Sequence, residues 1–288
     1  MTIDVKVINA FAVDGKGGNP AGVILNADGL TRKQMQAVAS RLAFPESAFV
    51  LKSDVADFRL DFFTPTKQIP HCGHATIGTF TYLKKNGSIP GMHSSKETID
   101  GTRRIFFKDG LAYMEQQKPV FKEVPEELFA ILSSLRLSIN ELIDGGRPFI
   151  VNPGNSFLII PVKDENTLAQ VQPDFDEIAS ISERYNLIGY YLFAPSKKEK
   201  VQATARMFAP YYGIPEEAAT GMATGPLACY LHTICNIKRT QFLVEQGRFM
   251  AHPSPSLLYV NLLVDGTSVQ NLYVGGDAYV SQEWSLSI

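Results

Sequence analysis

The apolar residues of this 288-residue chain form two kinds of helical pattern. Two segments, beginning near residues 73 and 221, are apolar around most of a helical circumference, which is typical of a helix buried on all sides. Their apolar residues include Ile77, Phe80 and Leu83 in the first and Leu227, Tyr230 and Leu231 in the second. Two other segments, around Thr31–Leu42 and Phe175–Tyr185, have the one-sided spacing of amphipathic helices.

Between the helices lie stretches rich in β-branched and aromatic residues, which predict strands. These stretches are Asp57–Phe63, Arg103–Phe107, Ala112–Gln116, Phe242–Glu245 and Leu257–Leu263. Residues 272–288 also read as strands, broken at Gly275-Gly276, and suit either of two sheets. The segment Lys118–Arg147, with its own short helical stretch, is the predicted link between domains.

The pattern repeats once along the chain. Residues 63–70 and 208–215 both read F-x-P-x-x-x-I-P, and residues 72–76 and 220–224 both fit [C/T]-G-x-A-T before a buried helix. Several elements agree in the same order, so we infer a duplicated domain. The prediction is an α+β fold of two pseudo-symmetric domains, each a curved sheet around a central helix. We place the first at residues 1–118 plus 272–288 and the second at 119–271.

Composition narrows the function classes. Apolar residues make up 45% and charged residues 19%, with a formal net charge of −2. This balance gives no electrostatic reason to expect nucleic acid or an anionic membrane as partner. No apolar run reaches the length of a membrane span, and the N-terminal residues lack the pattern of a leader peptide. Three cysteines without metal-ligand spacing predict a reducing, cytoplasmic location and no metal site.

Two glycine-initiated helices suggest a site for an anion. The backbone amides at Gly73-His74 and Gly221-Met222 begin the two buried helices, and such amides bind carboxylates at the positive end of the helix dipole. If the two halves pack with pseudo-two-fold symmetry, both helix starts face one cleft. The alternative is that each glycine only permits a tight turn.

Glu46 and His74 are the candidates for proton chemistry. Glu46 lies in the otherwise apolar stretch Leu42–Leu51, where desolvation favours acid–base function. The alternative is a glutamate facing solvent at the end of a strand. His74 is able to relay a proton or bind substrate, or else it only caps its helix. His71 is expected to be structural.

The motifs resemble those of the PhzF family, named for phenazine biosynthesis. They are Gly18-Asn19-Pro20-Ala21-Gly22-Val23, Pro45-Glu46-Ser47-Ala48-Phe49, Cys72-Gly73-His74-Ala75-Thr76, Arg206-Met207-Phe208-Ala209-Pro210, Pro215-Glu216-Glu217 and Ala219-Thr220-Gly221. The resemblance implies the diaminopimelate-epimerase-like fold, in which each domain is a β-barrel around a helix. It also implies catalysis without a cofactor and a homodimer.

The resemblance also assigns roles to residues. It matches Glu46 to the family's catalytic glutamate, places His74 at the site and matches Glu217 to a second acidic position, whose alternative is an exposed loop acid. Cys72 and Thr220 occupy the positions at which related racemases carry a pair of thiols. Threonine is a poor base at neutral pH, so Cys72 is expected to be a small buried residue beside the site.

Two residues depart from the family pattern. Glu217 replaces an aspartate, and Met222 replaces a small residue that is often serine. Methionine adds bulk and forms only weak hydrogen bonds. We therefore predict poor turnover of the phenazine-pathway substrate, a dihydro-hydroxyanthranilate, and a better fit for a smaller or more apolar acid.

The leading functional hypothesis is a cofactor-independent isomerase that moves a proton on a small carboxylic acid. Glu46 shuttles the proton, His74 and Glu217 polarise the substrate, and residues 72–74 and 220–222 surround it. One alternative is a Cys72-dependent epimerase or dehydratase that acts at an α-carbon. A third hypothesis is a non-catalytic protein that binds small acids.

Overall fold

The computed structural model describes residues 2–287, so the predicted domain ends at Met1 and Ile288 lie outside the described residues. The chain separates into two compact units. Unit 1 contains the residues up to Glu115 and those from Gly275 onward, and unit 2 contains Gln116–Val274. The domain boundaries at residues 118 and 272 therefore remain a prediction.

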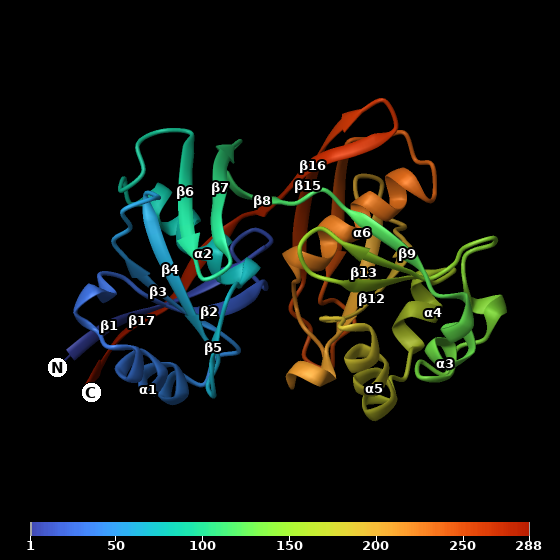
Figure 1. The fold of residues 1–288 in the computed structure, drawn as a ribbon, viewed down its shortest axis with the longest axis horizontal. Helices are drawn as coiled ribbons and strands as arrows, with labels where there is room; N and C mark the ends of the chain where they lie inside the picture. Colours follow the sequence, from blue (N-terminus) through green and yellow to red (C-terminus); the bar gives the residue numbers. More distant parts are fainter. Residues whose placement is uncertain (1, 288) are drawn as a thin grey trace. The chain divides into compact units, whose positions relative to one another are not determined.

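Unit 1 is a curved sheet with two helices (Figure 1). Its strands are β1 Thr2–Ala10, β2 Asn19–Ile24, β3 Ser47–Leu51, β4 Phe58–Phe63, β5 Gln68–Ile69, β6 His93–Thr98, β7 Gly101–Lys108, β8 Leu111–Gln116 and β17 Ala278–Ser287. Its helices are α1 Arg32–Leu42 and α2 Gly73–Lys85. Helix α2 packs against β1, β2, β3 and β17. The predicted central helix of the first half is therefore confirmed.

Unit 2 repeats this plan with additional short helices. Its strands are β9 Val120–Glu123, β10 Phe149–Asn152, β11 Phe157–Pro161, β12 Gly189–Pro195, β13 Ala203–Phe208, β14 Gln241–Gln246, β15 Ser256–Asp265 and β16 Ser268–Gly276. Its helices are α3 Leu128–Ser133, α4 Glu165–Gln170, α5 Phe175–Tyr185 and α6 Gly221–Thr233. Helix α6 packs against β10, β11 and β15.

The strand pairings show the repeat more clearly than the sequence does. In unit 1, β1–β2, β3–β4 and β6–β7 are antiparallel pairs, and β2–β3 and β4–β6 are parallel pairs. In unit 2, β10–β11, β12–β13 and β14–β15 are antiparallel, and β11–β12 and β13–β14 are parallel. In both units the second parallel connection contains the 13-residue buried helix, α2 or α6. The α+β class is confirmed.

Local sequence explains the amphipathic helices. Thr31 caps α1, and a capping box with Gln34 satisfies the first backbone donors of that helix. The buried face of α1, including Met35 and Val38, packs against Phe49 and Phe63 of the sheet. Asp174 caps α5 through its carboxylate, which accepts from the amide of Glu177.

One sequence expectation is wrong. The predicted link, Lys118–Arg147, is a packed part of unit 2, because Ile131, Leu132 and Leu135 are buried in that unit's core. Its polar residues and its glycine pair suggested a linker, but Ile131 and Leu132 of the short helix and Leu135 just after it face the core. Within residues 2–287, no helix is long and apolar enough to cross a membrane.

Candidate active site

Glu46 lies immediately before β3 in unit 1. Its backbone carbonyl accepts a hydrogen bond from the amide of Gly22 at 3.2 Å. Gly22 permits this approach, since a Cβ atom there would lie 3.0 Å from the Leu42 side chain and 3.1 Å from the Ser47 hydroxyl. Glu46 is buried, with only 8% of the residue exposed. The expectation that this acid is desolvated is thus confirmed, while its catalytic role stays a prediction.

His74, the second residue of α2, brings an imidazole to Glu46. Its Nε2 atom lies 3.4 Å from the Glu46 Oε2 atom. Its Nδ1 atom lies 3.2 Å from the Asn19 side-chain nitrogen. An amide nitrogen donates and does not accept, so Nδ1 is the acceptor when this nitrogen of Asn19 faces it, and Nε2 is the ring nitrogen that faces the carboxylate.

Burial determines the charge of this histidine. Desolvation lowers the pKa of His74 to about 4, against a smaller opposing effect of a hydrogen bond with the Pro20 backbone. The ring is therefore neutral at physiological pH. Its contact with Glu46 brings together a neutral donor and a carboxyl group and is not an ion pair.

Cys72 completes the cluster from the position just before α2. Its sulfur lies 3.6 Å from Nδ1 and 4.0 Å from Nε2 of His74. The Cys72 side chain is buried, as expected. The hydroxyl of Thr76 donates to the Cys72 carbonyl at 2.6 Å, which holds the first turn of α2 in place.

The same cluster has the donor types of a metal site. A carboxylate oxygen of Glu46, the sulfur of Cys72 and a ring nitrogen of His74 all lie within 4.8 Å of one another. Zinc binds all three kinds of donor. The positive end of α2 lies beside them, however, and opposes a cation. Acid–base chemistry or anion binding suits this electrostatic setting better.

In unit 2, the predicted residues lie around the start of α6. The hydroxyl of Thr220 donates to the carboxylate of Glu217 in a short hydrogen bond. The Gln246 side chain donates to the Glu217 carbonyl at 2.7 Å and accepts from the Thr220 amide at 3.0 Å. Glu217 is half-buried and held on both sides, and it is not a freely exposed loop acid.

Met222 is the residue at which the family pattern changes. Its side chain is half-buried, and its sulfur lies 3.8 Å from the side-chain nitrogen of Gln116. The same nitrogen donates to the Gly221 carbonyl at 2.9 Å. Glu216, the residue before Glu217, forms a bidentate ion pair with Arg206, with N–O distances of 2.8 and 2.9 Å. This pairing indicates a structural role for Glu216.

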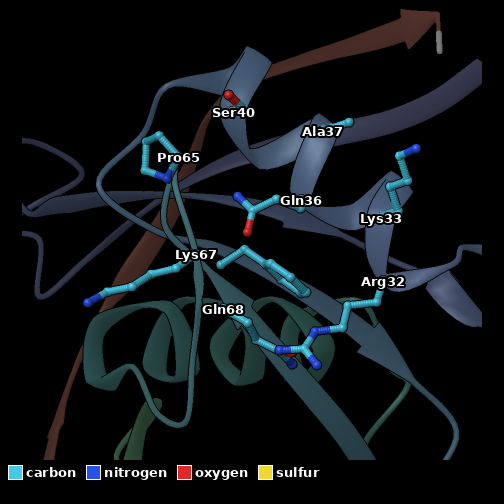
Figure 2. Close-up of a pocket in the computed structure, with 9 residues that line it drawn as sticks. Arg32, Lys33, Gln36, Ala37, Ser40, Pro65, Lys67 and Gln68 are labelled. Carbon is cyan, nitrogen blue, oxygen red and sulfur yellow. The ribbon is translucent and has the colours of Figure 1, made fainter.

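A surface groove in unit 1 has a different composition. Figure 2 shows its lining, which comes from α1 and from the turn between β4 and β5. The lining residues include three cationic side chains, Arg32, Lys33 and Lys67. None of the predicted site residues lines this groove, and the cluster around Glu46 is the better candidate for chemistry.

The sequence analysis did not predict a role for two further residues near the cluster. Asn19 belongs to the glycine-asparagine-proline motif, but its contact with His74 spans 55 positions. Lys96, on β6, is fully buried and lies within hydrogen-bond distance of Thr76. Lys96 lies outside the repeated motifs, so the sequence carried no signal for its burial.

The comparison with known proteins identifies the protein family. The family of phenazine biosynthesis-like proteins matches residues 8–283, and this chain belongs to that family. The expected resemblance to PhzF proteins is confirmed. A hydroxyproline epimerase from Agrobacterium vitis, at 13% identity and a TM-score of 0.63 over all of this chain and 93% of that one, shares the fold alone.

Particular relatives extend along nearly the whole chain. An uncharacterized isomerase of Clostridium acetobutylicum is 32% identical over 284 residues, covering 95% of this chain and 94% of the relative. The trans-2,3-dihydro-3-hydroxyanthranilate isomerase of Pseudomonas chlororaphis is 30% identical over 86% of this chain and 87% of its own. The crystal structure of a PhzF-family protein from Bacillus anthracis has a TM-score of 0.89 and 30% identity, with all of both chains covered.

Proposed function

We propose that this chain is an isomerase that moves a proton on a small carboxylic acid, with Glu46 as the acid–base group and without a cofactor. The observation that carries the proposal is the buried carboxylate of Glu46 beside the neutral His74. A buried carboxylate is a stronger base than one in water, which suits removal of a proton from carbon. The names of the relatives support an isomerase.

The first helical turn of α2 supplies the binding half of the mechanism. The amides of Gly73 and His74 lie at the start of this helix, at the positive end of its dipole. We propose that they hold the substrate carboxylate. Negative charge that develops when carbon loses its proton then spreads toward these donors, which lowers the barrier.

The proton balance of the proposed reaction is simple. Glu46 takes a proton from one carbon, the substrate double bond shifts, and Glu46 returns the proton to another carbon. No electrons are gained or lost, and water is not consumed. His74, whose Nε2 atom lies 3.4 Å from Glu46 Oε2, keeps the carboxyl group oriented between the two transfers.

Residues of unit 2 contribute a second set of contacts in this proposal. Glu217 polarises a substrate group, and Thr220, Gly221 and Met222 provide the surrounding surface. Their support is the hydrogen bonding of Glu217 by Thr220 and of its backbone by Gln246. The sharing of one cleft by both helix starts stays a prediction, as do the homodimer and the cytoplasmic location.

Deuterium exchange tests the proposal without a known substrate. The wild-type protein is incubated in D₂O with a panel of small unsaturated carboxylic acids that includes trans-2,3-dihydro-3-hydroxyanthranilate, and NMR follows deuterium uptake and double-bond migration. Glu46→Gln should slow both by a factor of about 10²–10⁴, and Glu199→Gln, at an exposed position, should change neither. Isomerisation at an undiminished rate in Glu46→Gln would contradict the assignment.

A Cys72-dependent epimerase or dehydratase is the second candidate. The observation in its favour is the contact between the thiol and His74. The counterpart of Cys72, Thr220, is a poor proton acceptor, which weakens a mechanism with two thiol bases. Cys72→Ser decides between the two: loss of α-carbon exchange supports the thiol, and retained isomerisation supports Glu46.

A further inference from the structure

Lys96 is a buried base that the proposed mechanism does not use. Its side chain has no exposed surface, although lysine is almost never fully buried without a charged partner. It projects from β6, in a strand whose buried face otherwise consists of Ser94 and Thr98. Burial of an ammonium group costs several kcal/mol, so its presence needs a reason.

The contacts of Lys96 converge on the turn that begins α2. Its Nζ atom lies 3.0 Å from Nδ1 of His71 and 2.7 Å from the hydroxyl oxygen of Thr76. That hydroxyl donates its own hydrogen to the Cys72 carbonyl, so it accepts from Lys96. The side chain thus holds residues on both sides of the Cys72-Gly73 junction, while the Phe62 ring lies 5.1 Å from Nζ.

The repeated architecture shows that the fold alone does not require this charge. Lys96 pairs with Phe58, five residues before Phe63, and Val244 pairs with Ala203, five residues before Phe208. Because Phe63 and Phe208 open the same repeated motif, Val244 is the counterpart of Lys96. Val244 is also fully buried, so the same position in the second sheet is filled by an apolar side chain.

The hydroxyl contacted by Lys96 also has a counterpart. Thr224 donates to the Thr220 carbonyl at 3.0 Å, as Thr76 does to Cys72. In unit 2 its hydroxyl is hydrogen-bonded to the neutral phenol of Tyr191, at 2.9 Å. Both helix starts are therefore braced in the same way, but only unit 1 uses a group that can carry charge.

The surroundings keep this charge adjustable near neutral pH. Desolvation lowers the pKa of Lys96 to about 7. Cys72 and Asp100 act in the opposite direction, and Arg103 adds to the lowering. Desolvation and the charges of Lys96 and Arg103 hold the pKa of His71 well below its usual value, so His71 stays neutral as the acceptor.

We propose that Lys96 is a positioning residue of the candidate site, which fixes the start of α2 through His71 and Thr76 and adds positive charge behind the carboxylate-binding amides. The second part rests on the proposed function. Lys96 itself touches no substrate. Its charge acts through the helix start, so substrate affinity should depend on its protonation, and affinity should fall as the pH rises through neutrality.

Binding of anthranilate, a fluorescent aromatic carboxylate, tests the effect of the charge. The wild type should bind it about tenfold more tightly at pH 6 than at pH 8.5, the size expected for one charge at low effective dielectric. Lys96→Met should bind weakly at both values, and Lys108→Met, at an exposed position of the same unit, should match the wild type. The same measurements in a Cys72→Ser background exclude titration of the Cys72 thiol as the cause of the pH dependence.

Two further measurements separate the brace from the charge. Thr76→Val cuts the link to the Cys72 carbonyl and keeps the ammonium, so it should weaken binding and preserve the pH dependence. In Lys96→Met, NMR of the ring protons should show His71 titrating at a higher pH than in the wild type. This second measurement needs no ligand and also verifies that the variant is folded.

The outcomes distinguish the two proposals. Absence of anthranilate binding in the wild type at pH 6 counts against the carboxylate site, and the His71 titration then decides whether Lys96 controls this turn. Equal pH dependence in the wild type and Lys96→Met, or an unchanged His71 titration, overturns the role of Lys96. Either result leaves the isomerase proposal to its own exchange assay.

Discussion

The two units have the same plan, but Glu46, Cys72 and His74 of the candidate site have counterparts of different chemistry in unit 2. Ser47 pairs with Phe63, and Tyr190 pairs with Phe208, so Glu46 corresponds to Gly189. A Cβ atom on Gly189 would lie 2.3 Å from the Phe208 carbonyl oxygen, so that position excludes any side chain unless the backbone moves. Duplication has conserved the scaffold and placed the candidate acid–base group in one copy.

The same contrast extends to the helix starts. Cys72 and His74 in unit 1 correspond to Thr220 and Met222 in unit 2, and Lys96 corresponds to Val244. Unit 1 therefore contains Glu46, Cys72, His74 and Lys96, whereas the corresponding part of unit 2 contains Glu217 within a hydrogen-bond network of Thr220, Gln246 and Tyr191. In the two proposals above, the acid–base group Glu46 and the positive charge of Lys96 thus belong to the same unit.

The strongest test of the difference between the units is to neutralise Glu46 in unit 1 and, separately, Glu217 in unit 2. Glu46→Gln should reduce isomerisation by a factor of about 10²–10⁴, the usual contribution of a general acid–base group. Glu217→Gln should cost about tenfold, because Glu217 only polarises in the proposed mechanism. Steady-state rates on the acid found by deuterium exchange check this. A larger loss in Glu217→Gln would place the base in unit 2.

Placing a lysine at Val244, the counterpart of Lys96 in unit 2, tests whether the second sheet tolerates a buried charge. Val244→Lys should destabilise the protein by about 3–5 kcal/mol, because unit 2 offers the new ammonium no prepared acceptors. Val244→Met is the control for added volume and should cost about 1–3 kcal/mol, less than the lysine. Urea unfolding measures both. A tolerated lysine would mean that both sheets accept a charge there.

The neutral His74 predicts an acid-sensitive native state. Unfolded histidine takes up a proton near pH 6.5, whereas native His74 does so near pH 4. Native stability should therefore fall by up to about 3 kcal/mol as the pH drops from 6.5 to 4, and this contribution is constant below that range. His74→Gln should remove that part of the slope, and His93→Gln, at an exposed site, should retain it. Urea unfolding at several pH values gives the slopes.

The smallest expected effect concerns Met222. Replacement by serine restores the hydroxyl that the family often has and frees volume, so turnover of trans-2,3-dihydro-3-hydroxyanthranilate should rise severalfold from a poor wild-type rate. Parallel assays of the wild type and Met222→Ser measure the ratio. Rapid turnover by the wild type, without a gain in the variant, would show that Met222 does not limit this substrate.

The sequence was informative where a pattern is local and repeated. The starts of α2 and α6 at Gly73 and Gly221 agree with the duplicated motif, and the apolar neighbours of Glu46 correctly indicated its burial. The contact between Asn19 and His74 was not predictable in this way, because it depends on strand β2 passing beside the start of α2. Lys96 was missed because a lysine among polar neighbours resembles a solvent-exposed strand residue.

The pairing of β1 with β17 has a consequence for the order in which the units become complete. Nine residues of β1, from Thr2 to Ala10, have partners in β17, between Ala278 and Ser287. Unit 2 is continuous in sequence, whereas the strands of unit 1 come from both sides of unit 2 along the chain. Helix α2 packs against β17, so the surroundings of Cys72 and His74 become complete only after that strand has been synthesised.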